Sequence, residues 1–381
     1  EEVVTRRVTN IIPNKKLLAE TLASGKKLNI YLGVDPTATR IHIGTAVPLR
    51  KLQEFVELGH NVTFLIGDFT ALIGDTSDKD AERPILTYEQ IRENFKTYKK
   101  QASKVLDFTK VKVKFNGEWL KKLNFVDVVK LCQHFSVGDF VSRELIRKRL
   151  DSGTKVGLHE FLYPVMQGYD SYFMDTDIQV GGADQTFNMQ AGRTLQKDLR
   201  DKESFVLVTG YLEGTDGRKM SKSWGNAIWL NDEPEEMFGK VMSLHDDLII
   251  QYFTFATNVA DEKIKSLEKK LNAKENPVNI KKDLAFTIVS ELHSEAEARR
   301  AQKAFEKTFQ ERAPEFNIKV EAGSLIKTIV PFTNRQSASA AKELIKQGAV
   351  DVNGVKAGDG SLMLKTGDEI KVGGRTFLKV K

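Results

Sequence analysis

Short β-rich runs alternate with helical patterns between residues 28 and 210, and this alternation restricts the fold more than any other feature of the sequence. The runs that predict strands are LNIYLGVD (28–35), NVTFLIGD (61–68), VKVKF (111–115), DIQVGG (177–182) and FVLVTG (205–210). Apolar residues recur at helical spacing over 45–58, 88–107, 138–150 and 158–174. We therefore predict an α/β fold with a doubly wound parallel sheet. Such sheets bind ligands beyond the carboxyl ends of their strands.

The character of the sequence changes twice after this region. Residues 231–320 are mostly helix-forming and rich in Lys, Glu, Ala and Leu, which predicts an α-helical domain. Residues 325–381 contain one helical pattern, SASAAKELIKQG, followed by short strands and Gly turns, which predicts a small α+β module. Between residues 331 and 381 there are nine basic and five acidic side chains. The sequence thus predicts three domains, over 1–230, 231–320 and 325–381.

Composition excludes several classes of protein. One cysteine, Cys132, cannot form a disulfide framework or a cysteine metal site, and it fits a reducing compartment such as the cytoplasm. No apolar run approaches the ~20 residues that a membrane span needs, and the first residues, EEVVTRRVTN, lack the apolar core of a signal peptide. The net charge of +6, from 58 basic and 52 acidic residues, permits an anionic partner without requiring one. No cluster of His, Asp and Glu suggests a metal site built by the protein.

The stretch YLGVDPTATRIHIGT (31–45) joins the first strand to a helix. Strand alternation places Tyr31, Gly33 and Asp35 on one face. The free backbone N–H groups and positive dipole at the start of the following helix favour a phosphate, and Gly44 lets a nucleotide approach the backbone. His42 stands within this turn. A plain strand–helix turn with a helix cap is the alternative interpretation.

The stretch GTDGRKMSKSWGN (214–226) is polar and rich in glycine, which predicts a mobile loop. Its two ammonium groups, on Lys219 and Lys222, would neutralise charge on a polyphosphate leaving group. A solvated basic loop is the alternative interpretation.

These two stretches together resemble the signature motifs of class I aminoacyl-tRNA synthetases. More closely, the sequence resembles the bacterial-type tyrosyl-tRNA synthetases, because YLGVDPTA, IGDTSDK, YPVMQGYD, QVGGADQ and KMSKS occur in that family's order and spacing. The resemblance covers nearly the whole chain. It implies a Rossmann-like catalytic domain, an anticodon-binding helical domain and an RNA-binding module. It also implies formation of tyrosyl-adenylate from tyrosine and ATP with Mg²⁺, transfer to tRNA-Tyr, and a homodimer formed through the region around 110–160.

A polar stripe lies on the predicted helix LYPVMQGYDSYFM (162–174). Tyr163, Gln167 and Asp170 fall at positions i, i+4 and i+7 of an otherwise apolar helix, so they need polar partners. The family resemblance implies that the partner is tyrosine, with Asp170 and Tyr31 bonding its phenolic hydroxyl. It further implies that Tyr163, Gln167 and Asp75 hold the amino group of tyrosine. Asp35 would help to hold both the amino group and the carboxylate.

The stretch QVGGADQ (179–185) ends a strand in two glycines, which suit an adenosine lying against the backbone. The resemblance implies that Asp184 binds the ribose, that Gly33 and Gly182 approach the nucleotide, and that Gln179 and Gln185 line the tyrosine pocket. The remaining residues implied to contact ATP or its phosphates are Thr37, His42, Gly44, Lys79, Arg83, Lys219, Met220, Ser221, Lys222 and Ser223.

Thr45 departs from the family pattern, which has a second histidine at this position. Its hydroxyl either caps a backbone N–H group of the helix or replaces the histidine as a donor to the nucleotide, and we favour the second interpretation. In the basic tail, the residues expected to contact tRNA phosphates are Arg335, Lys342 and Lys346.

Three alternatives to this function remain. Tryptophanyl-tRNA synthetase shares the fold and the chemistry. A small-molecule nucleotidyltransferase shares the His-x-Gly-x turn, although the helical domain and basic tail argue against it. A non-catalytic RNA-binding protein on a synthetase scaffold is the third, and the complete set of site residues argues against it.

Overall fold

A computed structural model describes residues 2–36, 39–74, 87–220, 224–309, 316, 318–374 and 376–381. The chain forms two compact units. The first comprises residues 1–212, 229–231 and 254–258, and the second comprises 213–228, 232–253 and 259–381. The predicted domain boundaries near residues 230 and 320 remain predictions, because the two compact units are divided at other residues. In the part of the chain that is described, we find no helix able to span a bilayer.

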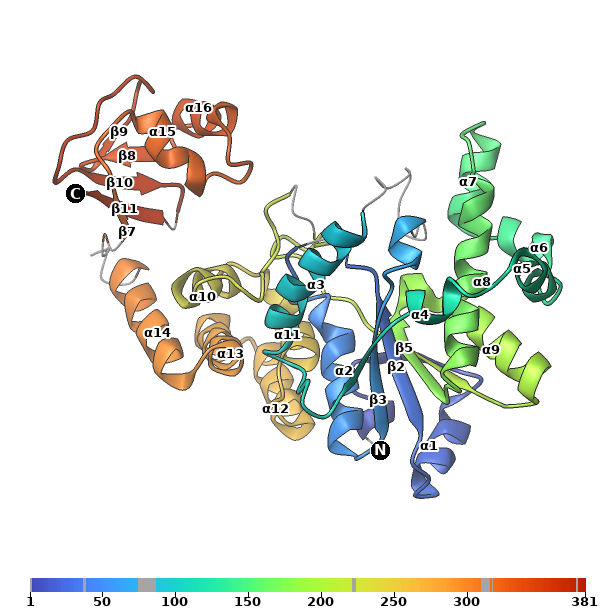
Figure 1. The fold of residues 1–381 in the computed structure, drawn as a ribbon. Helices are drawn as coiled ribbons and strands as arrows, with labels where there is room; N and C mark the ends of the chain where they lie inside the picture. The colour runs from blue at the N-terminus through green and yellow to red at the C-terminus, as the bar shows by residue number, and fades with distance from the viewer. Residues whose placement is uncertain are drawn as a thin grey trace. The chain divides into compact units, whose positions relative to one another are not determined.

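The first unit is built on a six-stranded sheet with the strand order β1–β6–β5–β2–β3–β4. Figure 1 labels three of its strands, β2, β3 and β5. The strands are β1 (Val8–Ile12), β2 (Asn29–Val34), β3 (Asn61–Ile66), β4 (Lys112–Phe115), β5 (Ile178–Gly182) and β6 (Phe205–Thr209). Strands β2 to β6 run parallel to one another, which confirms the predicted parallel sheet. Strand β1 pairs antiparallel with β6 and was not predicted.

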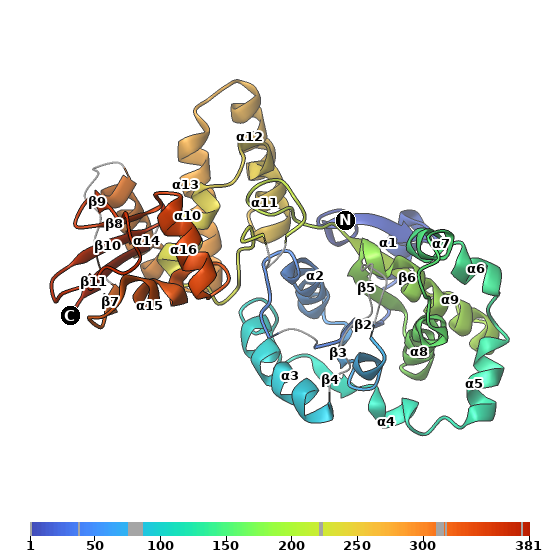
Figure 2. The same ribbon diagram turned by 90° about the horizontal axis from the view of Figure 1, so that it is seen from above.

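Helices cover both faces of this sheet (Figure 2). Helix α2 (Ala46–Glu57) packs on one face through buried residues such as Leu49, Leu52 and Phe55, and α8 (Leu158–Phe173) and α9 (Thr186–Arg200) lie on the other. The other helices of this unit are α1 (Lys15–Ala23), α3 (Tyr88–Ala102), α4 (Gly117–Leu120), α5 (Phe125–Cys132), α6 (Val137–Val141) and α7 (Glu144–Asp151). The single helix predicted over 138–150 was wrong, because Arg143 has an extended backbone that separates α6 from α7.

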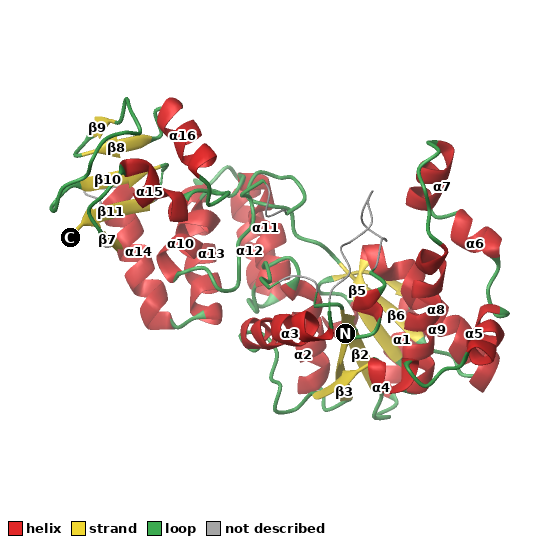
Figure 3. Ribbon diagram, turned by 45° about the horizontal axis from the view of Figure 1, so that its top comes forward, coloured by secondary structure: helices red, strands yellow, loops and turns green. Residues whose placement is uncertain are grey.

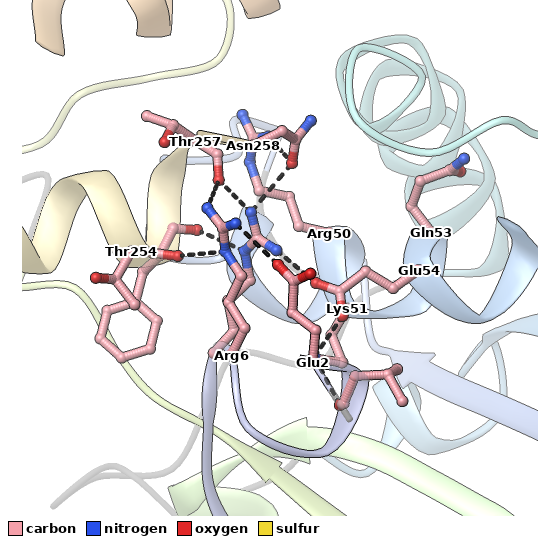
Figure 4. Close-up of polar contacts among 12 residues, drawn as sticks. Glu2, Arg6, Arg50, Lys51, Gln53, Glu54, Thr254, Thr257 and Asn258 are labelled. Atoms are coloured by element: carbon pink, nitrogen blue, oxygen red, sulfur yellow. Dashed lines mark hydrogen bonds and ion pairs between the residues drawn. The ribbon is translucent and has the colours of Figure 1, made fainter. Parts of the chain in front are cut away.

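A buried cationic cluster ties the N-terminal segment to α2 and to residues 254–258 (Figure 4). Arg6 Nη2 donates to the Thr257 carbonyl at 2.8 Å, and Arg7 contacts both that carbonyl and the Glu54 carboxylate. Lys51 Nζ donates to the Val3 carbonyl at 2.9 Å. Burial lowers the pKa of Lys51 to about 8, so the cluster holds its charges at a cost in solvation.

The second unit begins with helices and ends with a small α+β module. Its helices are α10 (Pro234–Met242), α11 (Ile249–Ala256), α12 (Asp261–Asn272), α13 (Pro277–Leu292) and α14 (Glu295–Phe309), and the last residues of α11 belong to the first unit. Helices α10, α13 and α14 pack against one another, and the ring centroids of Phe238 and Phe305 lie 5.5 Å apart. The helix-rich character predicted for this region is therefore confirmed.

The C-terminal module contains a five-stranded sheet in the order β7–β11–β10–β8–β9, together with two helices (Figure 3). Its elements are β7 (Ile318–Val320), α15 (Leu325–Ile329), α16 (Ala338–Lys346), β8 (Val350–Val352), β9 (Val355–Lys356), β10 (Glu369–Val372) and β11 (Thr376–Val380). Leu325, Ile345, Val350, Ile370 and Leu378 form its buried core. An α+β structure was predicted for this tail, and it is confirmed.

Candidate active site

Tyr31 and Gln179 lie opposite each other on the adjacent parallel strands β2 and β5. The Tyr31 hydroxyl donates to Gln179 Oε1 at 3.1 Å, and Gln179 Nε2 donates to the Met189 carbonyl of α9 at 2.8 Å. Both side chains are buried. Burial and, secondarily, the nearby charge of Asp170 raise the pKa of Tyr31 well above its ordinary value, so the hydroxyl stays protonated. Tyr31 and Gln179, both predicted as pocket residues, are therefore brought together.

Asp170 is a fully buried carboxyl group on α8, next to Tyr31. Its Oδ1 accepts a hydrogen bond from Trp119 Nε1 at 2.7 Å, and its Oδ2 accepts one from Asn116 Nδ2 at 3.1 Å. Burial raises the pKa of Asp170 to about 8, although the two donors oppose the shift. Asp35 and Asp68 raise the pKa further through charge repulsion. The carboxyl group is thus fixed in orientation, and its pKa of about 8 lies near neutral pH.

Asp35 links the end of β2 to α8. Its Oδ2 accepts from the Tyr163 hydroxyl at 2.8 Å, and its Oδ1 accepts from the Thr70 hydroxyl at 2.8 Å. Asn116 Nδ2 also donates to Thr70 Oγ1 at 3.0 Å, which connects this pair to the Asp170 carboxyl. Gly67 permits the arrangement, because a Cβ there would lie 1.9 Å from Asp35 Oδ1. Hydrogen bonds therefore connect these polar groups on one side of the sheet.

His42 and Thr45 lie together at the start of α2. The Thr45 N–H group donates to His42 Nδ1 at 3.1 Å, and the Thr45 hydroxyl lies 3.1 Å from His42 Nε2. Because an N–H group only donates, a neutral His42 carries its proton on Nε2. The His42 ring also packs edge-on against Trp229, with ring centroids 5.8 Å apart. Gly44 lies close to this ring, since a Cβ on it would be 3.1 Å from His42 Nδ1.

Other predicted residues of the first unit lie at the ends of β2 and β5 and along α8. Gly33 and Asp184 are exposed, and Gln167 is half-buried one helical turn after Tyr163. Gln185 Nε2 donates to Asp184 Oδ2 at 3.1 Å. Gln185 was predicted to line the tyrosine pocket, and the structure places its amide beside the Asp184 carboxylate. A Cβ on Gly182 would lie 2.6 Å from that carboxylate.

Seven predicted site residues lie outside the described residues, and their expected roles remain predictions. They are Thr37, Asp75, Lys79, Arg83, Ser221, Lys222 and Ser223.

Lys219 and Met220 belong to the second unit. Lys219 is exposed and forms an isolated β-bridge with Glu213, while Met220 is buried. Asp216 accepts hydrogen bonds from Asn226 and Arg218, and these lower the pKa of Asp216 to about 2. The described part of this glycine-rich stretch is therefore an organised turn.

The predicted tRNA-binding residues of the tail are exposed. Lys342 and Lys346 lie four residues apart on one side of α16, while Ala341 and Ile345 of the same helix are buried in the module core. Arg335 precedes this helix and is also exposed. Within the described ranges, no group of three or more His, Cys, Asp or Glu side chains is placed to hold a metal ion.

The family model for tRNA synthetases class I (W and Y) matches residues 23–310, and that for the tyrosine–tRNA ligase SYY-like C-terminal domain matches residues 304–374. The tyrosine–tRNA ligase of Carboxydothermus hydrogenoformans is 43% identical, in an alignment that covers 100% of this chain and 97% of that protein. The chain belongs to the tyrosine–tRNA ligase family of class I synthetases. A second member of this family, from Thermotoga maritima, is 40% identical over 100% of this chain and 96% of its own length.

Solved tyrosyl-tRNA synthetases share the fold. The truncated mitochondrial enzyme of Aspergillus nidulans superposes with a TM-score of 0.66 at 22% identity, covering 79% of this chain and 91% of that one. The Archaeoglobus fulgidus enzyme, solved with L-tyrosine, gives 0.63 at 22% identity, over 79% and 98% of the two chains. The resemblance to the tyrosyl-tRNA synthetases and the predicted fold class are thereby confirmed.

Three residues that bond to the predicted site residues Asp35 and Asp170 were missed by the sequence reasoning, namely Thr70, Asn116 and Trp119. Asn116 follows directly after β4, and Thr70 lies four residues beyond the end of β3. Both therefore stand at the carboxyl ends of parallel strands, where ligands bind in such sheets. The same rule, applied to the ends of β3 and β4, identifies both residues. Trp119 carries no comparable signal in the sequence, since a tryptophan at this position would be interpreted as a residue of the hydrophobic core.

Proposed function

We propose that this chain is a tyrosine–tRNA ligase that activates L-tyrosine with ATP and transfers it to the 3′ end of tRNA-Tyr. Its relatives at 40–43% identity over the full chain support this function. The observation that carries the substrate choice is the Asp170 carboxyl, which is buried beside Tyr31 and held by two donors at 2.7 and 3.1 Å.

The pocket favours a side chain that ends in a hydroxyl. The phenolic O–H of tyrosine would donate to Asp170 and lie against Tyr31, while Tyr163, Gln167, Asp35 and Asp75 would hold the amino acid's charged end. Phenylalanine offers no hydroxyl, so it would leave the buried polar groups of the pocket without a partner. Discrimination would therefore come from the desolvation of Asp170 and Tyr31.

Activation needs no nucleophile from the protein. An oxygen of the tyrosine carboxylate attacks the α-phosphorus of ATP, and the bond from that phosphorus to the bridging oxygen breaks, so its electron pair leaves with pyrophosphate. His42, with its proton on Nε2, and Thr45 would donate to the phosphates, and Mg²⁺ would arrive with ATP. Binding the phosphates more tightly in the transition state than in the ground state accelerates this step.

The remaining residue roles rest on family resemblance. We propose that Asp184 binds the ribose, and that Gly33, Gly44 and Gly182 approach the nucleotide. The residues proposed to act on the phosphates are Thr37, Lys79, Arg83, Lys219 and Lys222, with Met220, Ser221 and Ser223 beside them.

Transfer requires tRNA, and we propose that the exposed Arg335, Lys342 and Lys346 contact its phosphates. The reaction would take place in the cytoplasm, where tRNA and ATP are available. We also propose that a second copy of the chain covers the segment 125–162, where Phe125 is 83% exposed and Leu158 is 84% exposed. The other exposed apolar residues of this segment are Val126, Val129, Val137, Leu150 and Leu162. Exposed apolar side chains gathered in this way are typical of an interface.

ATP–pyrophosphate exchange tests the proposed activation step. The purified chain is given labelled pyrophosphate and ATP with tyrosine, with tryptophan, or with no amino acid. We expect exchange that depends on tyrosine. Exchange driven best by tryptophan would assign the chain to the other branch of its family, and no exchange with either would favour a non-catalytic role.

A further inference from the structure

The orientation of the Gln179 amide fixes the direction of the hydrogen bond to Tyr31. Gln179 Nε2 donates to the Met189 carbonyl at 2.8 Å, so Oε1 is the end that faces Tyr31. Because Oε1 only accepts, the hydroxyl proton of Tyr31 points towards Gln179. The Tyr31 oxygen consequently turns its lone pairs towards other partners.

Gly192 on α9 allows the Gln179 amide to occupy this position. A Cβ on Gly192 would lie 2.6 Å from Gln179 Oε1 and 2.7 Å from Nε2, so the amide lies directly over the glycine. The same Cβ would lie 2.8 Å from the Ser171 Cβ of α8. Gln179 is 1% exposed and is bonded at both ends of its amide, so a methyl group at this point would displace it from its partners.

We propose that Gly192 is a positioning residue that determines the specificity of the tyrosine pocket. By leaving room for Gln179, it makes Tyr31 a hydrogen-bond acceptor towards the ligand. This inference rests on the proposed function of the chain as a tyrosine-activating enzyme.

Two acceptors can then face the hydroxyl of a bound tyrosine, the Tyr31 oxygen and an oxygen of the Asp170 carboxyl group. Such a pair selects a ligand that carries a donor, which is the phenolic O–H group of tyrosine. If Gln179 is displaced, the Tyr31 hydroxyl loses its acceptor and becomes free to rotate. The preference for a ligand with a donor then weakens, while the phosphate chemistry remains as it was.

The Gly192→Ala variant should show this loss in ATP–pyrophosphate exchange. We expect the KM for tyrosine to rise about tenfold, the ratio that corresponds to one net hydrogen bond. The KM for phenylalanine should stay within about twofold, because phenylalanine makes no bond to Tyr31, and kcat with tyrosine should also change by less than about twofold. The selectivity for tyrosine over phenylalanine therefore falls by about the same tenfold.

Gly168→Ala is the matched control at the same packing of α8 on α9. A Cβ on Gly168 would lie 3.0 Å from the Ala191 carbonyl oxygen and 3.2 Å from Leu195 Cδ1, so it disturbs the helix contact, and its three nearest atoms belong to Ala191 and Leu195. It should lower the melting temperature and leave the selectivity for tyrosine unchanged. Equal loss of selectivity in Gly168→Ala and Gly192→Ala would show that helix separation is the cause, and the proposal would be overturned.

A double-mutant cycle with Gln179→Ala tests the route directly. In the Gln179→Ala background no amide remains to be displaced, so Gly192→Ala should raise the KM for tyrosine by less than about twofold more. Independent, multiplying effects would overturn the proposal. If Gly192→Ala alone fails to fold, the same measurements are made with Ser171→Gly added, which removes the 2.8 Å contact.

The outcome for the parent protein separates the two proposals. A parent without tyrosine-dependent exchange contradicts the proposed function. A parent with such exchange, together with a Gly192→Ala variant that keeps the parent KM and selectivity, contradicts only the role of Gly192.

Discussion

The hydroxyl of Thr45 lies 3.1 Å from Nε2 and 3.2 Å from Nδ1 of His42, and it makes no capping hydrogen bond to the backbone of α2. Two interpretations were considered for Thr45, a helix cap and a donor to the nucleotide. The structure lacks the hydrogen bond that the helix cap requires. The Thr45 side chain is directed instead at the imidazole. This contact supports our proposal that His42 and Thr45 act together on the nucleotide.

Replacing Thr45 with alanine should slow activation and leave stability nearly unchanged. Losing a bond to a charged phosphate corresponds to about 1.5–3 kcal/mol, so adenylate formation should slow at least about tenfold at saturating tyrosine. Rapid-quench measurement of adenylate formation checks the expected rate, and a thermal melt checks the expected stability. Thr45→Ser keeps the hydroxyl and should retain most of the rate. An alanine variant that melts earlier yet forms adenylate at the parent rate would show that the hydroxyl has only a structural role.

The buried carboxyl of Asp170 should make stability fall as pH rises. Its pKa is 3.8 in the unfolded chain and about 8 in the folded one, so the folded state binds the extra proton between these values. The resulting stabilisation is complete below about pH 4 and is lost as pH rises through about 8. Asp170→Asn removes this dependence. The free energy of unfolding of the variant minus that of the parent should increase by about 2 kcal/mol or more between about pH 5 and about pH 8.

Urea denaturation at the two pH values measures this difference. The amide introduced by Asp170→Asn would set its own N–H groups against the N–H donors of Asn116 or Trp119, which lowers the free energy of unfolding. This loss is the same at both pH values, so it cancels in the comparison. A difference that does not change with pH would mean that Asp170 stays ionised throughout the range.

The cationic cluster at the N-terminal segment should contribute strongly to stability. Arg7 is 3% exposed and contacts the Glu54 carboxylate, so Arg7→Met leaves a partly buried anion without this partner. We expect a loss of about 3–5 kcal/mol in the free energy of unfolding, measured in urea. Lys16→Ala is the control, because Lys16 and Glu20 form an exposed pair 3.9 Å apart, and its effect should stay within about 0.5 kcal/mol. Similar effects of the two substitutions would contradict a stabilising role for the cluster.

The exposed lysines of α16 should matter for tRNA and not for activation. Changing both Lys342 and Lys346 to alanine should raise the KM for tRNA and reduce the salt dependence of tRNA binding by about one unit of slope for each lost phosphate contact. Exchange of ATP and pyrophosphate should stay within about twofold of the parent.

Lys379 and Lys381 provide a control with the same change in net charge. Their ammonium groups pair with Glu369 at 3.0 Å and Glu321 at 2.8 Å, so their loss should affect tRNA much less. Equal effects of the two double variants would mean that the tail attracts tRNA through its net charge alone.

Local sequence patterns predicted the architecture well where one signal dominated. The alternation of β-rich runs with helical patterns predicted the parallel sheet, because parallel neighbours need a crossover connection that is usually a helix. Strand β1 escaped notice, since VTNII is short, mixes polar with apolar residues and pairs only at the edge of the sheet. The break between α6 and α7 escaped as well, because it depends on the backbone of a single residue, Arg143.

The candidate site could be predicted in part, and the limit has a physical cause. Tyr163, Gln167 and Asp170 stand out as a polar stripe on an apolar helix, which is a property of the local sequence. The contacts that orient Asp170 come from Asn116 and Trp119, more than fifty residues away in the chain and brought close only by the sheet. The close approach of Gly192 to Gln179 also depends on how α9 crosses β5, which no local pattern encodes.

Aminoacylation of unfractionated bacterial tRNA tests the central claim most directly. The purified chain is incubated with ATP, Mg²⁺ and tRNA, and each of the labelled amino acids tyrosine, phenylalanine and tryptophan is supplied in turn. The structure predicts that tyrosine becomes attached to tRNA and that phenylalanine and tryptophan remain at background. Attachment of tryptophan in preference to tyrosine, or of none of the three by a folded protein, would contradict the account.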